Sequence, residues 1–202
     1  MKKILFLIML LTASCCRNAG DFTAEEKALI NRSATGIETM VPEGTMRVLT
    51  IADPADNAVL RASSSNLSKK ALQSEDYASL CSLMVATVTH PSQDGVGIAG
   101  PQVGLNRRVV AVQRFDKEGE PFEVYPNISI VWASDSLEAG PEGCLSVPDR
   151  REDVMRSTEI EIEYADSSNG YETVRERVSG FTAVIFQHEI DHLDGILYID
   201  RL

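Results

Sequence analysis

The sequence is short of histidine, of positive charge and of long hydrophobic runs, and each shortage narrows what the protein can do. It has 3 histidines, and 19 lysines and arginines against 30 acidic residues, for a net charge of -11 at pH 7. The lack of a basic excess argues against sequence-independent binding of nucleic acid, and mildly against binding to an anionic membrane surface. The 4 cysteines have no regular spacing, which argues against a disulfide framework.

The longest hydrophobic run lies at the N-terminus and is too short for a membrane-spanning helix. Lys2 and Lys3 precede apolar residues 4–11, and small residues then lead to Cys15, whereas a spanning helix needs about 20 apolar residues. This order is typical of an export signal. We therefore expect residues 1–14 to be a signal peptide and Cys15, or alternatively Cys16, to be lipidated as in a bacterial lipoprotein. A plain cleaved signal or an uncleaved anchor are the alternatives.

The remainder predicts one α+β domain. With 202 residues, 44% of them hydrophobic, the chain can form one core. We read residues 15–45 as a tether and residues 46–202 as the domain. Helical periodicity predicts helices over 74–90, with Ser74 as N-cap, and over 181–193, closed by Asp194-Gly195. The predicted strands are 46–51, ended by Asp53-Pro54, then 108–112, 128–132, 158–164 and 171–178. Antiparallel sheets are expected to surround one functional helix.

The helix over 181–193 carries the most informative motif, His188-Glu189-Ile190-Asp191-His192. At 3.6 residues per turn the two histidines lie one turn apart on the same face, where both imidazoles can bind one metal ion. Glu189 lies beside them and can hold a water molecule. The alternative is a pair of core histidines satisfied by hydrogen bonds.

Two histidines leave a metal ion short of a protein ligand, and the best candidate for the third is Cys144. It lies in a predicted glycine-bounded loop, Pro141-Glu142-Gly143-Cys144-Leu145-Ser146. A thiolate with two imidazoles leaves the fourth tetrahedral position to water. Taken alone, such a cysteine is more often a small buried hydrophobic residue.

A glycine-rich segment, residues 95–104, is the third feature. It lacks the lysine and Ser/Thr of a phosphate-binding loop, so a nucleotide site is disfavoured. We expect an exposed strand edge that an extended peptide can approach, with Gly97 and Ile98 fixing its register and Gln102 facing the site.

Together these segments resemble the peptide deformylase family. The family's three motifs correspond here to residues 95–104, Glu142–Ser146 and His188–Gly195, with Gly100 as a departure where the family has a second alanine. The resemblance covers about residues 46–202. Members are cytoplasmic as a rule, so the apparent export signal is a second departure.

The resemblance implies hydrolysis of the formyl group from N-formylmethionyl peptides at a metal held by Cys144, His188 and His192. It implies Fe(II), with Zn(II) or Ni(II) as alternatives; the ligand types alone favour zinc. We expect Glu189 to act as base and then acid, and Gln102 with the Leu145 N–H to stabilise the oxyanion. The methionine pocket is expected to contain Val96, Val184 and Ile185.

Two other functions are compatible with these motifs. A zincin-like metallopeptidase shares the His-Glu-x-x-His motif, but it usually takes a downstream third ligand, and no histidine follows His192. An inactive, surface-tethered peptide-binding protein of the same fold is the second. Its weakness is that all the candidate catalytic residues are present.

Overall fold

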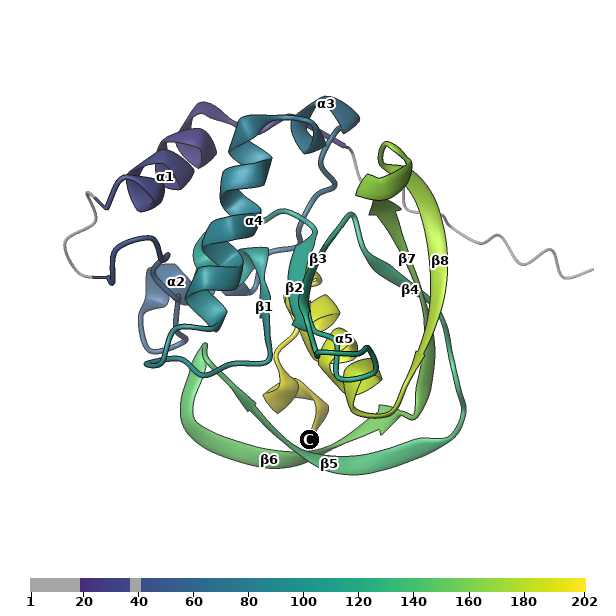
Figure 1. Ribbon diagram of the computed structural model, residues 1–202. Coiled ribbons are helices and arrows are strands. Elements are labelled where there is room, and N and C mark those ends of the chain that lie inside the picture. Colours follow the sequence, from purple (N-terminus) through teal and green to yellow (C-terminus); the bar gives the residue numbers. More distant parts are fainter. Residues whose placement is uncertain (1–18, 37–40) are drawn as a thin grey trace, which may run out of the picture.

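The computed structural model describes residues 19–36 and 41–202, and its centre is a single buried helix. Three antiparallel sheets surround this helix, and the N-terminal helices gather on one side of the molecule (Figure 1). The helices are α1 (Ala24–Ala34), α2 (Pro54–Leu60), α3 (Lys69–Leu72), α4 (Glu75–Val88) and α5 (Gly180–Leu193), with short 3-10 helices η1 (Gly100–Val103), η2 (Ser167–Asn169) and η3 (Tyr198–Arg201).

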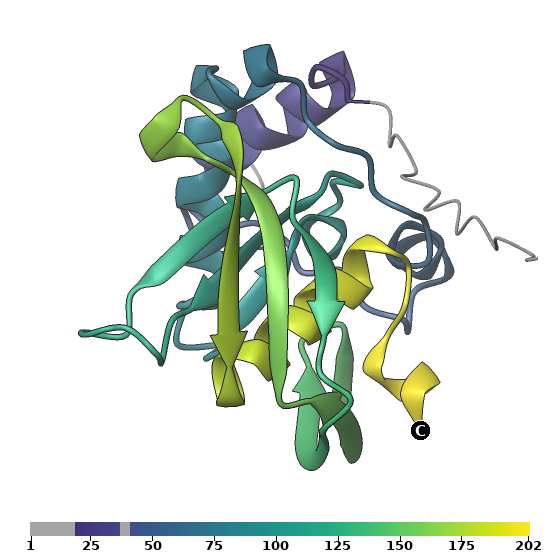
Figure 2. The same ribbon diagram turned by 90° about the vertical axis from the view of Figure 1, so that its right-hand side faces the viewer.

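The sheets have simple antiparallel pairings. The strands are β1 (Gly97–Ala99), β2 (Val109–Gln113), β3 (Phe122–Pro126), β4 (Ser129–Ala133), β5 (Leu137–Cys144), β6 (Val147–Ser157), β7 (Glu159–Asp166) and β8 (Glu172–Ser179). They form the sheets β1-β2-β3 and β4-β7-β8 and the two-stranded ribbon β5-β6. Figure 2 shows the β4-β7-β8 sheet in front of α5. The predicted α+β class, with antiparallel sheets around a functional helix, is confirmed.

Helix α5 is buried on nearly all sides, which explains why its sequence is so apolar. All residues from Ile185 to Leu193 are buried, and the charged and polar ones among them are the candidate site residues and their neighbours. The helix ends before Gly195, whose φ is +75°. A Cβ added at this position would lie 2.4 Å from the Arg61 carbonyl oxygen. Only glycine tolerates both the backbone angle and that contact.

Several predicted elements are confirmed with small shifts in their ends. Helix α4 begins after Ser74, whose hydroxyl accepts a hydrogen bond from the Tyr77 N–H at 3.2 Å. In β7, Ile160 and Ile162 face the core, while the glutamates that alternate with them lie on the wetter face. Alternation of apolar and acidic residues therefore predicted this strand correctly.

The predicted strand over 46–51 is wrong. Its backbone N–H groups bond to three separate segments: Met46 to the Thr87 hydroxyl at 2.8 Å, Leu49 to the Gln102 carbonyl at 2.8 Å and Ile51 to the Ser146 carbonyl at 3.0 Å. No single neighbouring strand takes them, so no ladder forms. Asp53 does not end a strand either, because its carboxylate caps α2.

The predicted loop around Cys144 is also wrong, because this cysteine is the last residue of β5. Strand β5 pairs with β6 from Leu137 to Cys144. The strand was not predicted because it contains Gly140, Pro141 and Gly143, and glycine and proline are depleted in strands. They are tolerated here because the ribbon has only two strands and its outer face is open to solvent.

The segment predicted as a tether, residues 15–45, includes helix α1, which packs onto α4. Ile30 is fully buried, Lys27 pairs with Asp76 at 2.9 Å, and Glu26 pairs with Arg107 at 2.7 Å. The predicted signal peptide and Cys15 lie outside the described residues. Within the described ranges, no helix has the length and apolar character to cross a membrane.

Candidate metal centre

The two histidines of α5 lie one turn apart, as the helical spacing predicted, and Cys144 at the end of β5 lies beside them. The His188 and His192 rings have centroids 5.1 Å apart, and the Cys144 sulfur lies 3.2 Å from Nε2 of His192. One ligand atom from each of the three residues lies within 4.8 Å of the others, and this is the single such group among the described residues. Three donors at this separation can share one cation.

Glu142 orients the His188 ring. The His188 Nδ1–H donates to the Glu142 carboxylate at 2.7 Å, which leaves Nε2 to face the other ligands. Burial would raise the pKa of Glu142, but hydrogen bonds from Arg156 and His188 hold it at about 2. Glu142 is therefore an anion that fixes the imidazole, an arrangement common behind metal-ligating histidines. This role was not predicted from the sequence, although Glu142 precedes Cys144 by two residues on the same strand face.

The electrostatics of the three ligands favour a bound cation. Burial alone would raise the pKa of the Cys144 thiol, but the His192 and His188 imidazoles lower it well below its ordinary value. Although burial opposes the shift, hydrogen bonds to Cys144 and Glu142 raise the pKa of His188 to about 10. The Cys144 thiolate and the Glu142 carboxylate thus stabilise a positive charge at this site. Its sulfur and nitrogen donors fit a Zn(II)- or Fe(II)-type ion.

Glu189 lies in the same site, against β1. It is 4% exposed, and its Oε2 has no hydrogen-bond partner within the described part of the chain. A Cβ on Gly97 would lie 2.5 Å from Glu189 Oε1, so glycine at this position makes room for the carboxylate. Burial raises the pKa of Glu189 to about 7, although the imidazoles oppose the shift. A carboxyl group with such a pKa can both accept and return a proton near neutral pH.

Gln102 presents its amide nitrogen to the site. Its Oε1 accepts from the Ala99 N–H at 2.8 Å, and its Nε2 lies 3.3 Å from the Ser146 hydroxyl and 3.6 Å from the Cys144 sulfur. The side chain is 1% exposed, so this orientation is held by packing as well as by the bond to Ala99. The amide is therefore a directed donor.

Gly100, the departure from the family pattern, has a local cause. A Cβ at this position would lie 2.6 Å from the Arg107 carbonyl oxygen and 2.7 Å from that of Leu105. In this backbone an alanine would collide with both, so the chain carries glycine and keeps Gln102 in place.

A cavity of about 700 Å³ opens beside the candidate ligands, and Cys144 and His188 line it. The predicted pocket residues Val96, Val184 and Ile185 line it, as do Gly97, Leu145, Gln102 and Glu189. The Ile98 side chain is fully buried in the core and does not line the cavity. Its predicted backbone contact with a substrate, like the predicted roles of the other site residues, stays a prediction.

The further lining residues that were not predicted from the sequence include Phe181, Arg150 and Arg151. Phe181 precedes His188 by two helical turns on the same face, and this spacing was the signal available for it. The arginines follow Cys144 on β6, and only the ribbon's fold brings them to the cavity.

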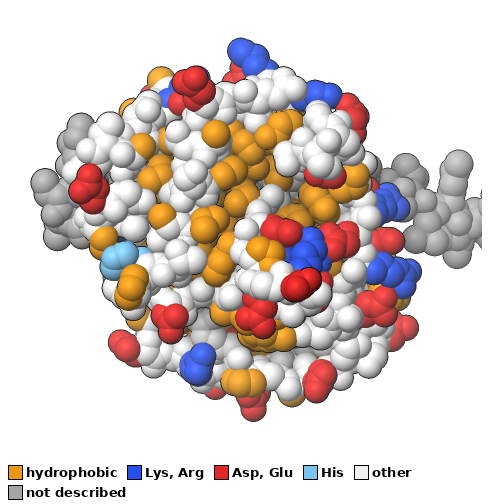
Figure 3. All heavy atoms as spheres, in the orientation of Figure 1, with side chains coloured by type: hydrophobic (Ala, Val, Ile, Leu, Met, Phe, Trp, Pro, Cys, Tyr) orange, Lys and Arg blue, Asp and Glu red, His pale blue; other side chains and the backbone are white. Residues whose placement is uncertain are grey.

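A second hollow, of about 650 Å³, shares no lining residue with the first. Tyr77, Cys81, Val124 and Tyr164 contribute to it. Figure 3 shows hydrophobic side chains gathered on this face, with acidic and basic groups interspersed around them. It contains none of the metal-ligating groups.

The buried helix with its two imidazoles and glutamate, completed by a thiolate from a β-ribbon, defines the class of metal-dependent hydrolases. Residues 46–202 match the family described as polypeptide deformylase. The chain belongs to this family.

Relatives and solved structures agree with this assignment. A peptide deformylase from Leptospira biflexa is 35% identical over 153 residues, covering 72% of this chain and 83% of the relative. Peptide deformylase 2 of Vibrio cholerae is 37% identical over 146 residues, covering 71% and 84%. The structure of an Acinetobacter baumannii peptide deformylase bound to Met-Ala-Ser has a TM-score of 0.69 at 33% identity and covers 78% of this chain and 98% of its own.

The same A. baumannii enzyme has also been solved with actinonin bound, at a TM-score of 0.68 and 33% identity, with 78% and 98% covered. The predicted reaction class is confirmed: the chain is a hydrolase of the peptide deformylase type, which removes the N-formyl group from peptides.

Proposed function

We propose that this chain releases formate from N-formylmethionyl peptides at the site formed by Cys144, His188 and His192. The observation that carries the proposal is the meeting of these three donors within 4.8 Å beside a buried glutamate oxygen without a protein partner. When bound there, a divalent ion lowers the pKa of a water molecule and polarises the formyl oxygen.

Glu189 moves the proton in this proposal. Its carboxylate accepts a proton from the attacking water, and it then returns that proton to the peptide amine as the formyl carbon–nitrogen bond breaks. The raised pKa of about 7 supports both steps, because the group changes charge near neutral pH. Its burial keeps bulk water from competing for the proton.

The Gln102 amide and the Leu145 N–H stabilise the oxyanion that develops on the formyl oxygen. The bond from Ala99 to Gln102 Oε1 supports this role, because it leaves Nε2 as the group that can donate. Leu145 follows Cys144 directly and lines the cavity. Loss of one such donor typically lowers the rate about 100-fold.

The peptide lies along the free side of β1, whose other side pairs with β2. Gly97 lines the cavity at this edge and allows a close backbone approach. Val96, Val184 and Ile185 form the apolar pocket for the methionine side chain. The Met-Ala-Ser bound to the A. baumannii relative supports a peptide of this kind as ligand.

We further propose Fe(II) as the native metal, with Zn(II) and Ni(II) as functional replacements, and export of the protein as a lipoprotein through Cys15. The soft thiolate and the two imidazoles support any of these ions. The N-terminal charge, apolar run and adjacent cysteine support export. Metal analysis of protein purified without oxygen, and fractionation of cells with labelling of lipidated Cys15, test these two points.

The central test is formate release from formyl-Met-Ala-Ser by the metal-loaded chain, compared with cleavage of casein. We expect formate release and no internal peptide cleavage. Glu189→Ala should keep the metal and lose turnover at least about 100-fold, because its proton transfer is lost. Unchanged turnover in that variant would contradict the role of Glu189, and casein cleavage would favour the peptidase. Peptide binding without turnover in the native chain would favour an inactive binding protein.

A further inference from the structure

A chain of alternating charges runs from the metal ligand His188 to the C-terminal turn. Glu142 accepts from His188 and, on its other side, from Arg156 Nε and an Arg156 terminal nitrogen at 2.7 and 3.0 Å. The second terminal nitrogen of Arg156 donates to Asp191 at 2.6 Å. Arg201 then grips Asp191 with two nitrogens, both at 2.5 Å.

The middle of this ionic chain is buried, whereas its outer end is exposed to solvent. The side chains of Glu142, Arg156 and Asp191 are 5%, 4% and 11% exposed, but that of Arg201 is 41% exposed. Asp191 thus has an arginine on each side, and its carboxylate geometry is set by both. Because buried charges keep their partners, a change at Arg201 is transmitted inward through Asp191 to Arg156.

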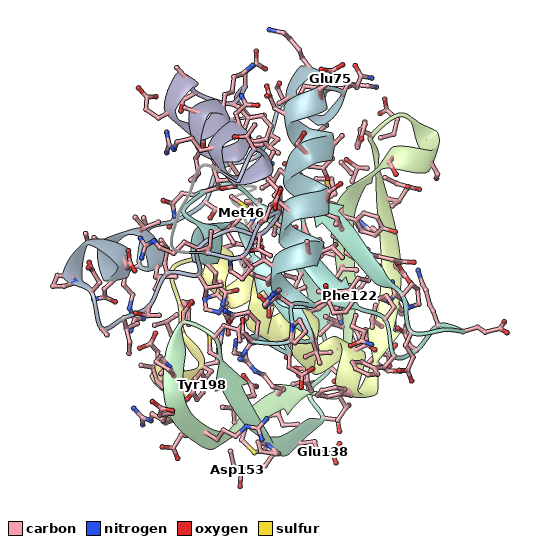
Figure 4. The ribbon with its side chains drawn as sticks, turned by 60° about the vertical axis from the view of Figure 1, so that its left-hand side comes forward. Met46, Glu75, Phe122, Glu138, Asp153 and Tyr198 are labelled. Carbon is pink, nitrogen blue, oxygen red and sulfur yellow. The ribbon has the colours of Figure 1, made fainter. Side chains whose placement is uncertain are left out.

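The same turn also touches His188 directly. Tyr198, in η3 with Arg201, stacks on the His188 ring at a centroid distance of 6.0 Å and an angle of 23°. Its hydroxyl donates to the Arg150 carbonyl at 2.9 Å, which ties η3 to β6. Figure 4 shows Tyr198 beside the β5-β6 ribbon. Turn η3 therefore reaches the metal ligand by ring stacking and by the ionic chain.

We propose that Arg201 is a positioning residue for the metal centre: by holding Asp191 it keeps Arg156 and Glu142 in the arrangement that orients His188. This inference rests on the proposed Cys144–His188–His192 metal site. Its consequence is that metal retention depends on a half-exposed arginine that touches neither ligand nor substrate.

The test is the rate at which the zinc-loaded full chain releases zinc to a colorimetric chelator. Changing a direct partner of a ligating histidine typically costs 10- to 100-fold in metal affinity. Arg201 acts through two intervening side chains, so we expect Arg201→Met to release zinc about 3- to 10-fold faster. Arg201→Lys keeps the charge without the two-nitrogen grip and should give an intermediate rate.

Arg61→Met is the matched control. Arg61 pairs with Asp200, the neighbour of Arg201 in η3. Within the described residues, no hydrogen bond or ion pair joins Arg61 or Asp200 to Glu142, Arg156 or Asp191. If η3 is only loosened by losing an ion pair, both variants will release zinc at the same raised rate, and the proposal is overturned. A zinc release rate for Arg201→Met equal to that of the native chain overturns it too.

A spectroscopic readout separates positioning from folding. In the cobalt-loaded chain, Arg201→Met should shift the sulfur-to-cobalt absorption band, whereas Arg61→Met should leave it unchanged. If Arg201→Met does not fold, the Arg201→Lys rate decides, and a native rate overturns the proposal. A native chain that binds no zinc at all contradicts the metal site itself and this inference with it. Native zinc binding with unaffected variants contradicts this inference alone.

Discussion

Arg114 and Arg156 are both buried arginines surrounded by carboxylates, yet their surroundings differ in one respect. The Arg114 side chain is 1% exposed, but its partners Asp116, Glu123 and Glu176 are 28–35% exposed. Arg156 is 4% exposed, and its partners Glu142 and Asp191 are 5% and 11% exposed. Acids that keep contact with water can be rehydrated when the arginine is lost, whereas fully buried acids cannot.

The two clusters also have different neighbours. Arg114, which directly follows β2, lies over the buried Phe186 ring of α5 and bonds to Tyr125 in β3 and Glu176 in β8, so its cluster links these elements. The Arg156 cluster ends on the imidazole of His188, one of the proposed metal ligands. The same pairing of residue types is therefore expected to stabilise the fold in one place and to orient a proposed metal ligand in another. The difference in expected role follows from the group that the last carboxylate of each cluster contacts.

Arg156→Met should have the largest effect of any change in either cluster. It leaves Glu142 buried without its main partner, and breaking a buried pair in this way costs about 3–5 kcal/mol. Urea denaturation should show this loss, and the remaining folded protein should release zinc faster than the native chain. Native zinc retention in this variant would place the cluster outside the metal site.

Arg114→Met should cost less stability, about 2–3 kcal/mol, because its partners regain water. Formate release per folded molecule and zinc retention should stay at the native level. This variant is the sharpest check on the comparison, measured by denaturation and by the chelator assay side by side. A loss of zinc as large as that of Arg156→Met would show that the two clusters do not differ in function.

Glu142→Gln preserves shape but removes the charge that faces His188. The zinc dissociation constant should rise about 10- to 100-fold, as for other partners of ligating histidines. Glu176→Gln, the corresponding change in the Arg114 cluster, is the control and should leave zinc affinity unchanged. Competition with a chelator of known affinity measures both, and equal affinities for the two variants would contradict the assigned role of Glu142.

The smallest effect is expected at Asp116. Its pKa is lowered to about 2, chiefly by its hydrogen bonds to Arg114. Because the folded-state pKa lies below the ordinary 3.8, Asp116 contributes stability above pH 3.8 that is lost as the pH falls toward about 2. Asp116→Asn should therefore be less stable than the native chain by about 1 kcal/mol at neutral pH. The difference should shrink to zero in strong acid; a pH-independent difference in urea denaturation would contradict the assignment.

Local patterns predicted the helices and the alternating strand well. The spacing of His188 and His192, the Ser74 cap and the acidic alternation in β7 all depend on residues near each other in the chain, where geometry follows from the helical or strand period. The segment 46–51 was misassigned because its bonding partners come from three distant segments. The β5-β6 ribbon was missed because Gly140, Pro141 and Gly143 disguise it.

By itself, the sequence determined that two imidazoles and a carboxylate share one helix face, and the family motifs indicated which reaction they serve. Only the tertiary structure decided that Cys144 and His192, 48 residues apart, meet at 3.2 Å, that Glu142 orients His188, and that Arg201 closes the ionic chain behind it. The physical reason is that a helical period positions residues within a turn or two. Contacts between distant segments depend instead on how the whole core packs and on which buried charges find partners.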